Sequence, residues 1–117
     1  MGRYLGQATF RYQANLTVTS IETATNVNPV SVNTRYFVDT RSGTVTLTLP
    51  QGPAAGNFIE IIDSYGVWDL NNCIVNPSGD GSLVSGFADN LTINVSKANV
   101  RLTYSSGKND WILTDSL

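Results

Sequence analysis

Residues 44–49, TVTLTL, alternate strictly between polar and apolar side chains. This period of two places Val45, Leu47 and Leu49 on one face of a β-strand and the threonines on the other. Pro50 follows directly, and proline fits a strand only at an end, an edge or a bulge because it cannot donate to the ladder. The segment therefore predicts a short strand with one buried face that ends at Pro50.

The chain on both sides of this segment repeats the pattern. Residues 51–56, rich in Gly, Pro and Ala, predict a turn, and residues 58–62, FIEII, predict a strand that runs back beside the first. Other short strands are expected at residues 36–38, 73–76, 91–95, 100–104 and 111–113. No window shows an apolar period of 3.6 residues long enough for a helix, so we expect an all-β fold, a small antiparallel sandwich or jelly-roll-like domain.

Residues 1–33 are expected to form an extended N-terminal arm, and residues 34–117 the β-domain. Residues 16–21 predict one short strand within the arm. The apolar side chains of an isolated arm would be exposed to water, so they are expected to pack on their own domain or on another chain. We favour an arm that anchors to, or is swapped with, another chain. Its candidate contact residues are Arg3, Tyr4, Leu5, Phe10, Arg11 and Tyr12.

The composition argues against several classes of function. A chain of 117 residues can form one domain whose core needs no metal or disulfide. Only 14% of the residues are charged and the net charge is −2, so the basic stripe typical of nucleic-acid-binding proteins is missing. No apolar run approaches the ~20 residues of a membrane-spanning helix, and the first residues contain no apolar core of a secretory signal. We therefore expect neither nucleic acid nor membrane as a partner.

The sequence offers few catalytic candidates. It contains no histidine, which argues against Ser-His-Asp and Cys-His catalysis. Its one cysteine, Cys73, is expected to be a buried, inert thiol. Glu60 and Asp63 are three residues apart, a spacing that on a strand directs side chains to opposite faces, so they do not form a glycosidase pair. The remaining acids considered lie beside turn-forming residues and are expected to close turns: Asp39, Asp69, Asp80, Asp89 and Asp110. We expect a protein that is not an enzyme and uses no cofactor.

Residues 76–81, NPSGDG, resemble a calcium-binding loop, with oxygen-bearing side chains at alternate positions and glycine in the sixth. The twelfth position, where such a loop places a bidentate Glu, is Phe87. An Asx-type turn is the preferred interpretation, and no metal site is expected.

Aromatic side chains supply one more candidate site, a platform on which a sugar ring could stack. Tyr65 and Trp68 lie close together in a loop that contains Gly66, and Trp68 is expected to be exposed. Trp111, in the last predicted strand, is expected to be a core or sheet-closing residue. Glycan contact through Tyr65 and Trp68 is therefore an alternative hypothesis for this chain.

Five phrases follow one another between residues 36 and 113: YFVDTRSGTVTLTLP, PAAGNFIEIIDSYG, NCIVNP with a Gly-rich turn after it, NLTINVSKANVRLTY and NDWIL. In this order they resemble a β-module that recurs in virion structural proteins of tailed bacteriophages. The module is found in head-decoration (cement) proteins and in head or tail fibres, commonly as trimers, and has no catalytic motif. The resemblance extends over about two thirds of the chain.

The resemblance implies a capsid decoration protein that binds the outer surface of the phage head as a homotrimer and stabilises the shell. Its partners would be the major capsid protein and other copies of itself. It would be made in the cytoplasm of the bacterial host and be found in the virion. The alternative is a head or tail fibre, or an adhesin module, that binds host-surface glycan.

Overall fold

The computed structural model describes residues 20–23 and 25–115 of the chain. In this part the regular secondary structure consists of strands without any helix, which confirms the predicted all-β class. The strands are β1 (Ser20–Thr23), β2 (Thr34–Val38), β3 (Val45–Thr48), β4 (Phe58–Asp63), β5 (Cys73–Asn76), β6 (Leu83–Val84), β7 (Leu91–Ile93), β8 (Asn99–Ser105) and β9 (Asp110–Asp115).

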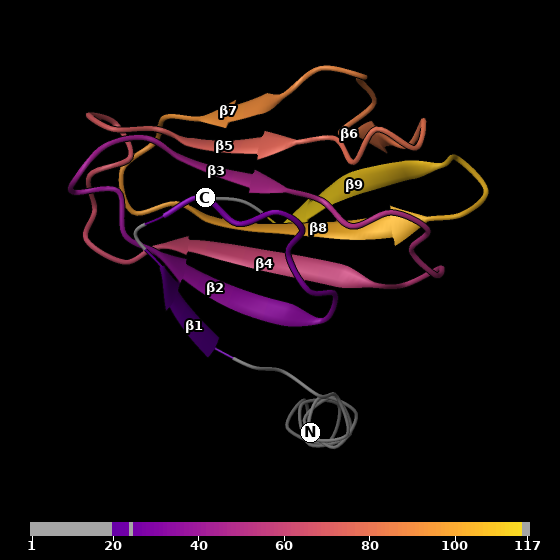
Figure 1. The fold of residues 1–117 in the computed structure, drawn as a ribbon, viewed down its shortest axis with the longest axis horizontal. Coiled ribbons are helices and arrows are strands. Elements are labelled where there is room, and N and C mark those ends of the chain that lie inside the picture. The colour runs from indigo at the N-terminus through magenta and orange to yellow at the C-terminus, as the bar shows by residue number, and fades with distance from the viewer. Residues whose placement is uncertain (1–19, 24, 116–117) are drawn as a thin grey trace, which may run out of the picture.

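The strands form two sheets that pack into a sandwich (Figure 1). A large sheet has the order β1-β2-β4-β8-β9-β6, and a small sheet has the order β3-β5-β7. Strands that follow one another in sequence often lie in different sheets, so the chain crosses repeatedly between the two layers. These crossings place one apolar face of each sheet against the other.

The pairing within the sheets is mixed rather than purely antiparallel. β4–β8, β8–β9 and β5–β7 are antiparallel pairs, as expected. β1–β2, β2–β4, β3–β5 and β6–β9 are parallel pairs, which the sequence reasoning did not foresee. The prediction that residues 58–62 run back beside residues 44–49 is wrong, because β3 lies in the small sheet and β4 in the large one. A period of two identifies the buried face of a strand, but it does not identify the neighbouring strand.

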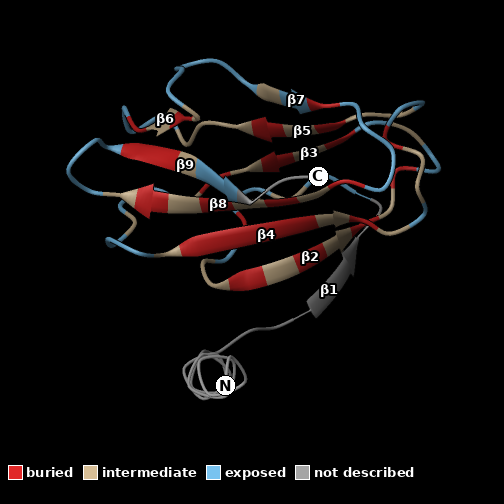
Figure 2. Ribbon diagram, turned by 180° about the vertical axis from the view of Figure 1, so that it is seen from behind, coloured by how far each residue is buried: buried red, intermediate tan, exposed pale blue. Residues whose placement is uncertain are grey.

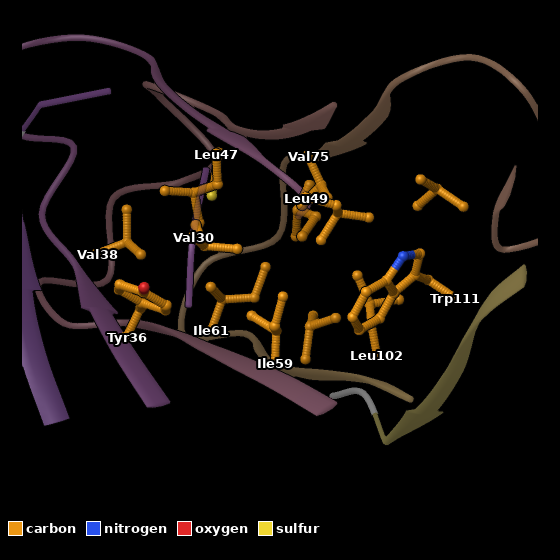
Figure 3. Packing of buried hydrophobic residues seen from close by; sticks show 14 of the residues in the cluster. Val30, Tyr36, Val38, Leu47, Leu49, Ile59, Ile61, Val75, Leu102 and Trp111 are labelled. Carbon is orange, nitrogen blue, oxygen red and sulfur yellow. The ribbon is translucent and has the colours of Figure 1, made fainter. Parts of the chain in front are cut away.

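The core lies between the sheets and is built from alternating positions of each strand. Figure 3 shows Leu47 and Val75 of the small sheet directed toward Ile59, Ile61 and Leu102 of the large sheet. In β8 every second residue is buried, which is the pattern that period-two alternation predicts. Trp111 is completely buried and lies against the Tyr104 ring, with a centroid distance of 5.4 Å, so its predicted place in the core is confirmed.

The centre of the large sheet is covered on its outer face as well. Glu60 of β4 is buried and accepts a hydrogen bond from Arg35 Nε of β2 at 2.6 Å. The guanidinium carbon of Arg101 lies 4.1 Å from the centroid of the Phe58 ring. Two arginines therefore cover β4 from outside, which explains why nearly all of its residues are buried.

One lateral edge of the sandwich is closed by the segment before β2. Val27 N donates to Thr46 O at 3.0 Å, and Thr48 N donates to Val27 O at 2.9 Å, so this segment pairs with the outer edge of β3. Val30 follows and is buried in the core. Residues 20–23 and 27–30, which the sequence reasoning placed in the arm, thus pair with strands of the β-domain. Residues 1–19, with the arm candidates Arg3, Tyr4, Leu5, Phe10, Arg11 and Tyr12, lie outside the described residues.

Candidate functional site

Trp68 belongs to the core, and its predicted exposure is wrong. Its side chain is completely buried, and its indole Nε1 donates a hydrogen bond to Val38 O at 3.3 Å. The cause is Asp63 at the end of β4, a buried carboxylate that organises the loop after it. Its oxygens accept backbone hydrogen bonds from Gly66, Val67 and Trp68 at 2.9, 3.2 and 3.1 Å. These bonds fold the loop back and direct the indole inward, so Trp68 offers no face to a ligand.

Tyr65, the second residue of the predicted glycan platform, remains at the surface with 48% of its area exposed. The Arg41 guanidinium carbon lies 3.5 Å from the centroid of its ring and covers one ring face. Asp39 fixes this arginine through Nε–Oδ1 and Nη2–Oδ2 contacts of 3.0 and 2.9 Å. These hydrogen bonds hold the pKa of Asp39 below its usual range. A sugar could therefore not stack on the ring face that the arginine occupies.

The loop that resembles a calcium site is held by hydrogen bonds of its own. Ser82 N donates to Asp80 Oδ1 at 2.9 Å, which confirms the predicted Asx-type turn. The Ser78 and Ser82 hydroxyls donate to the same oxygen at 2.5 and 2.7 Å, and Gly52 N donates to Oδ2 at 3.0 Å. The serine hydroxyls in particular hold the pKa of Asp80 well below its usual range. Among the described residues, no group of three His, Cys, Asp or Glu side chains is placed to hold a metal ion.

Cys73 lies at the start of β5 and is completely buried, as predicted. Burial, followed by the charge of Asp63, raises the pKa of its thiol to about 12. A thiol with such a pKa is protonated at neutral pH and is a poor nucleophile.

The most exposed apolar side chains lie on loops and at the ends of strands. Leu70 and Phe87 have 76% and 69% of their areas exposed. Phe87 follows a two-residue turn in which Val84 N donates to Phe87 O at 2.8 Å and Phe87 N donates to Val84 O at 3.1 Å. Gly86 N is fixed further by Asp110 Oδ1 at 3.0 Å. The turn therefore fixes the backbone at a residue whose aromatic ring is exposed to solvent, a feature that sequence reasoning missed.

A shallow groove lies beside β7, at the lateral edge opposite to the closed one. Its volume is about 210 Å³, and its apolar lining consists of Leu91, Ile93, Val95, Ala98, Val100 and Leu113. Val95 and Leu113 of this lining are themselves well exposed. Sequence reasoning assigned these residues to strands and turns. The groove forms only in the folded protein, where β7 at the edge of the small sheet lies near β8 and β9 of the large sheet. These apolar features make the surface suited to contacts with other macromolecules.

No known family model matches this chain, and no curated protein matches it in sequence. Over residues 20–23 and 25–115, no helix has the length and apolar character needed to cross a membrane.

Proposed function

We propose that this protein is a structural protein of a tailed-bacteriophage virion, a decoration subunit that binds the outer surface of the head. The observation that carries the proposal is the order of the five phrases that resemble the virion β-module. The phrases coincide with strands in chain order, with β6 left out: β2 and β3, then β4, then β5, then β7 and β8, and finally β9. The resemblance therefore extends through both sheets of the sandwich rather than one hairpin.

The character of the surface supports a structural role. Only 14% of the residues are charged, and large apolar side chains stand exposed at Leu70 and Phe87. An assembly is stabilised when a neighbouring subunit covers such side chains and removes them from water. The buried carboxylates Glu60 and Asp63 hold Arg35 and a loop backbone, as expected of structural rather than catalytic groups. We propose the major capsid protein and further copies of this chain, as a homotrimer, as its partners, and no enzymatic activity.

Labelling of intact phage particles with a gold-coupled antibody against this chain, read by electron microscopy, tests the proposal. Label distributed over the whole head is expected. Label confined to the neck or tail would replace the decoration role with a fibre role and would reopen glycan binding, with Tyr65 as its remaining aromatic contact. Particles without label would overturn the proposal.

A reconstitution experiment tests the predicted arm. Purified full-length protein is added to heads that lack it, and saturation is compared with that of a chain that lacks residues 1–19. The deletion ends before Ser20 because β1 and Val30 belong to the sandwich, so a deletion of residues 1–30 would remove part of the fold. A truncated protein that is folded but fails to saturate the heads is expected. Saturation equal to that of the full-length chain would exclude an anchoring arm.

A further inference from the structure

Leu113 of the large sheet lies on the face that forms the core, but the small sheet does not cover it. Leu113 of β9 pairs with Leu102 of β8, and residues opposite each other in neighbouring strands share a face of the sheet. Leu102 is completely buried, whereas 39% of Leu113 is exposed. The small sheet ends at β7, while the large sheet continues through β9 and β6. Figure 2 shows the result, with the C-terminal part of β9 exposed beside β8, whose residues alternate between buried and intermediate.

The groove of about 210 Å³ lies at this place, between β7 and the strands that carry Val100 and Leu113. β7 is an edge strand, because β5 pairs with one of its sides and no described strand pairs with the other. The free edge therefore presents backbone N–H and C=O groups along Leu91–Ile93. An apolar groove beside a free strand edge is the arrangement that accepts one added strand.

The opposite edge of the sandwich shows what such a strand accomplishes. There, Val27 pairs with β3 through two backbone hydrogen bonds, and Val30 enters the core. β3 is thus protected on its outer side, whereas β7 has no counterpart to this segment among the described residues. The sandwich is therefore closed on one side and open on the other.

The chain itself contains a sequence suited to the open edge. Residues 8–19, ATFRYQANLTVT, alternate strictly: the even positions are Ala, Phe, Tyr, Ala, Leu and Val, and the odd positions are polar. Such a pattern predicts a strand with one apolar face. Phe10 and Tyr12 carry the largest apolar side chains of this face. A cavity of about 150 Å³ admits a benzene molecule, so a groove of about 210 Å³ has room for the Phe10 ring.

The path of the chain indicates that the added strand comes from another molecule, which we call the donor. β1 lies at one end of the large sheet, and β9 is four strands away, about 19 Å at the usual spacing. Another 10 Å or so separates the two sheets, and the core blocks the direct path. Residues 13–19, which would link Tyr12 to β1, span at most about 25 Å when fully extended. Figure 1 shows β1 and β7 on opposite sides of the molecule.

We propose that residues 8–12 of a second copy of this chain pair with the free edge of β7 and insert Phe10 into the groove beside Leu113, with Tyr12 on the same face of the added strand. The donor segment and the acceptor edge are different surfaces, so exchange continues from copy to copy until a closed oligomer forms. Insertion covers Leu113, and the added segment becomes the fourth strand of the small sheet. This inference does not depend on the proposed location in the virion.

The test uses the full-length chain and measures its mass in solution by light scattering over a range of concentrations. The wild type is expected to be oligomeric. Leu113→Asp in the groove and Phe10→Asp in the donor segment are each expected to weaken self-association about tenfold or more. Ala55→Asp is the control, because Ala55 is exposed and lies outside the groove, so the same charge is expected there to leave the oligomer intact.

Mixing the two defective chains distinguishes exchange between molecules from docking within one molecule. The Phe10→Asp chain retains an intact groove, and the Leu113→Asp chain retains an intact donor segment. A mixed complex with one arm-to-groove contact is therefore expected at concentrations where neither chain alone associates with itself. If no complex forms on mixing, the exchange between copies is overturned.

Hydrogen exchange supplies a readout that needs no substitution. The amides of Leu91, Thr92 and Ile93 that face away from β5 are expected to gain protection in the oligomer and to lose it on dilution.

If circular dichroism shows that Leu113→Asp is unfolded, Val95→Asp replaces it, because Val95 also lines the groove and is half exposed. A wild type that is monomeric at all concentrations, or an oligomer indifferent to both groove and donor substitutions, overturns the proposal.

Discussion

The backbone amide of Trp68 donates a hydrogen bond to Asp63 Oδ2 at 3.1 Å, and the same carboxylate oxygen accepts a second bond from Lys97 N at 2.9 Å. One buried side chain at the end of β4 thus joins two loops, and its bond to Lys97 N spans 34 positions in the sequence. The indole of Trp68 is fixed below this junction, in the core. Asp63 therefore determines both the shape of this end of the sandwich and the burial of its tryptophan.

Asp63→Ala is expected to lower the free energy of unfolding by roughly 2–4 kcal/mol, since it leaves several loop amides without their acceptor. Asp63→Asn retains one carbonyl oxygen and is expected to cost less. Urea denaturation followed by tryptophan fluorescence measures both. Asp89→Ala, at an exposed position, is the control and should change stability little. An effect of Asp63→Ala as small as that of the control would show that Asp63 does not organise these loops.

Trp68→Ala is expected to cost about 3–5 kcal/mol, because it removes a fully buried indole and leaves a cavity. Tyr65→Ala, three residues earlier, is expected to cost less than about 1 kcal/mol, since it removes a half-exposed ring and one exposed cation–π contact. Thermal denaturation of the two variants side by side measures the difference. Equal losses would contradict the burial of Trp68. A loss of ligand binding by Trp68→Ala would therefore not by itself place Trp68 in a binding site, because the variant is also destabilised.

Local patterns in the sequence predicted most of the strands, although β6 was not foreseen. The alternation in residues 44–49 and 100–104 gave the buried faces of β3 and β8, because burial on one face of a strand follows directly from the period of two. The pairing of β3 with β5 rather than β4 could not be predicted in this way. The pairing depends on which of the two sheets each strand joins, and this is decided by the packing of the whole chain.

The surface was less predictable than the core. The indole of Trp68 donates its hydrogen bond to Val38 O, a contact across 30 positions that no local pattern reports. The groove beside β7 depends on the difference in strand number between the two sheets. The Asx-type turn at Asp80 was predictable, because its contacts with Ser78 and Ser82 lie within two residues.

The thiol of Cys73 should make stability fall at alkaline pH. Burial raises its pKa from about 9 to about 12, so between these values the thiol ionises in the unfolded chain but remains protonated in the folded one. The free energy of unfolding should therefore decrease as pH rises through this window, by on the order of 1 kcal/mol per pH unit. Cys73→Ala should show a shallower decrease when denatured in parallel. Identical slopes for the two proteins would contradict the raised pKa.

Ser85→Asn is expected to stabilise the protein. Ser85 and Gly86 both have positive φ, 50° and 86°, at the centre of the two-residue turn before Phe87. Turns of this type favour Asn-Gly, because asparagine tolerates the left-handed region better than serine does. We expect a gain of roughly 0.5 kcal/mol in the free energy of unfolding, measured by urea denaturation. Ser85→Val, with a β-branched side chain that resists positive φ, is the matched control and should destabilise the protein. If valine is tolerated as well as asparagine, backbone strain at this turn does not limit stability.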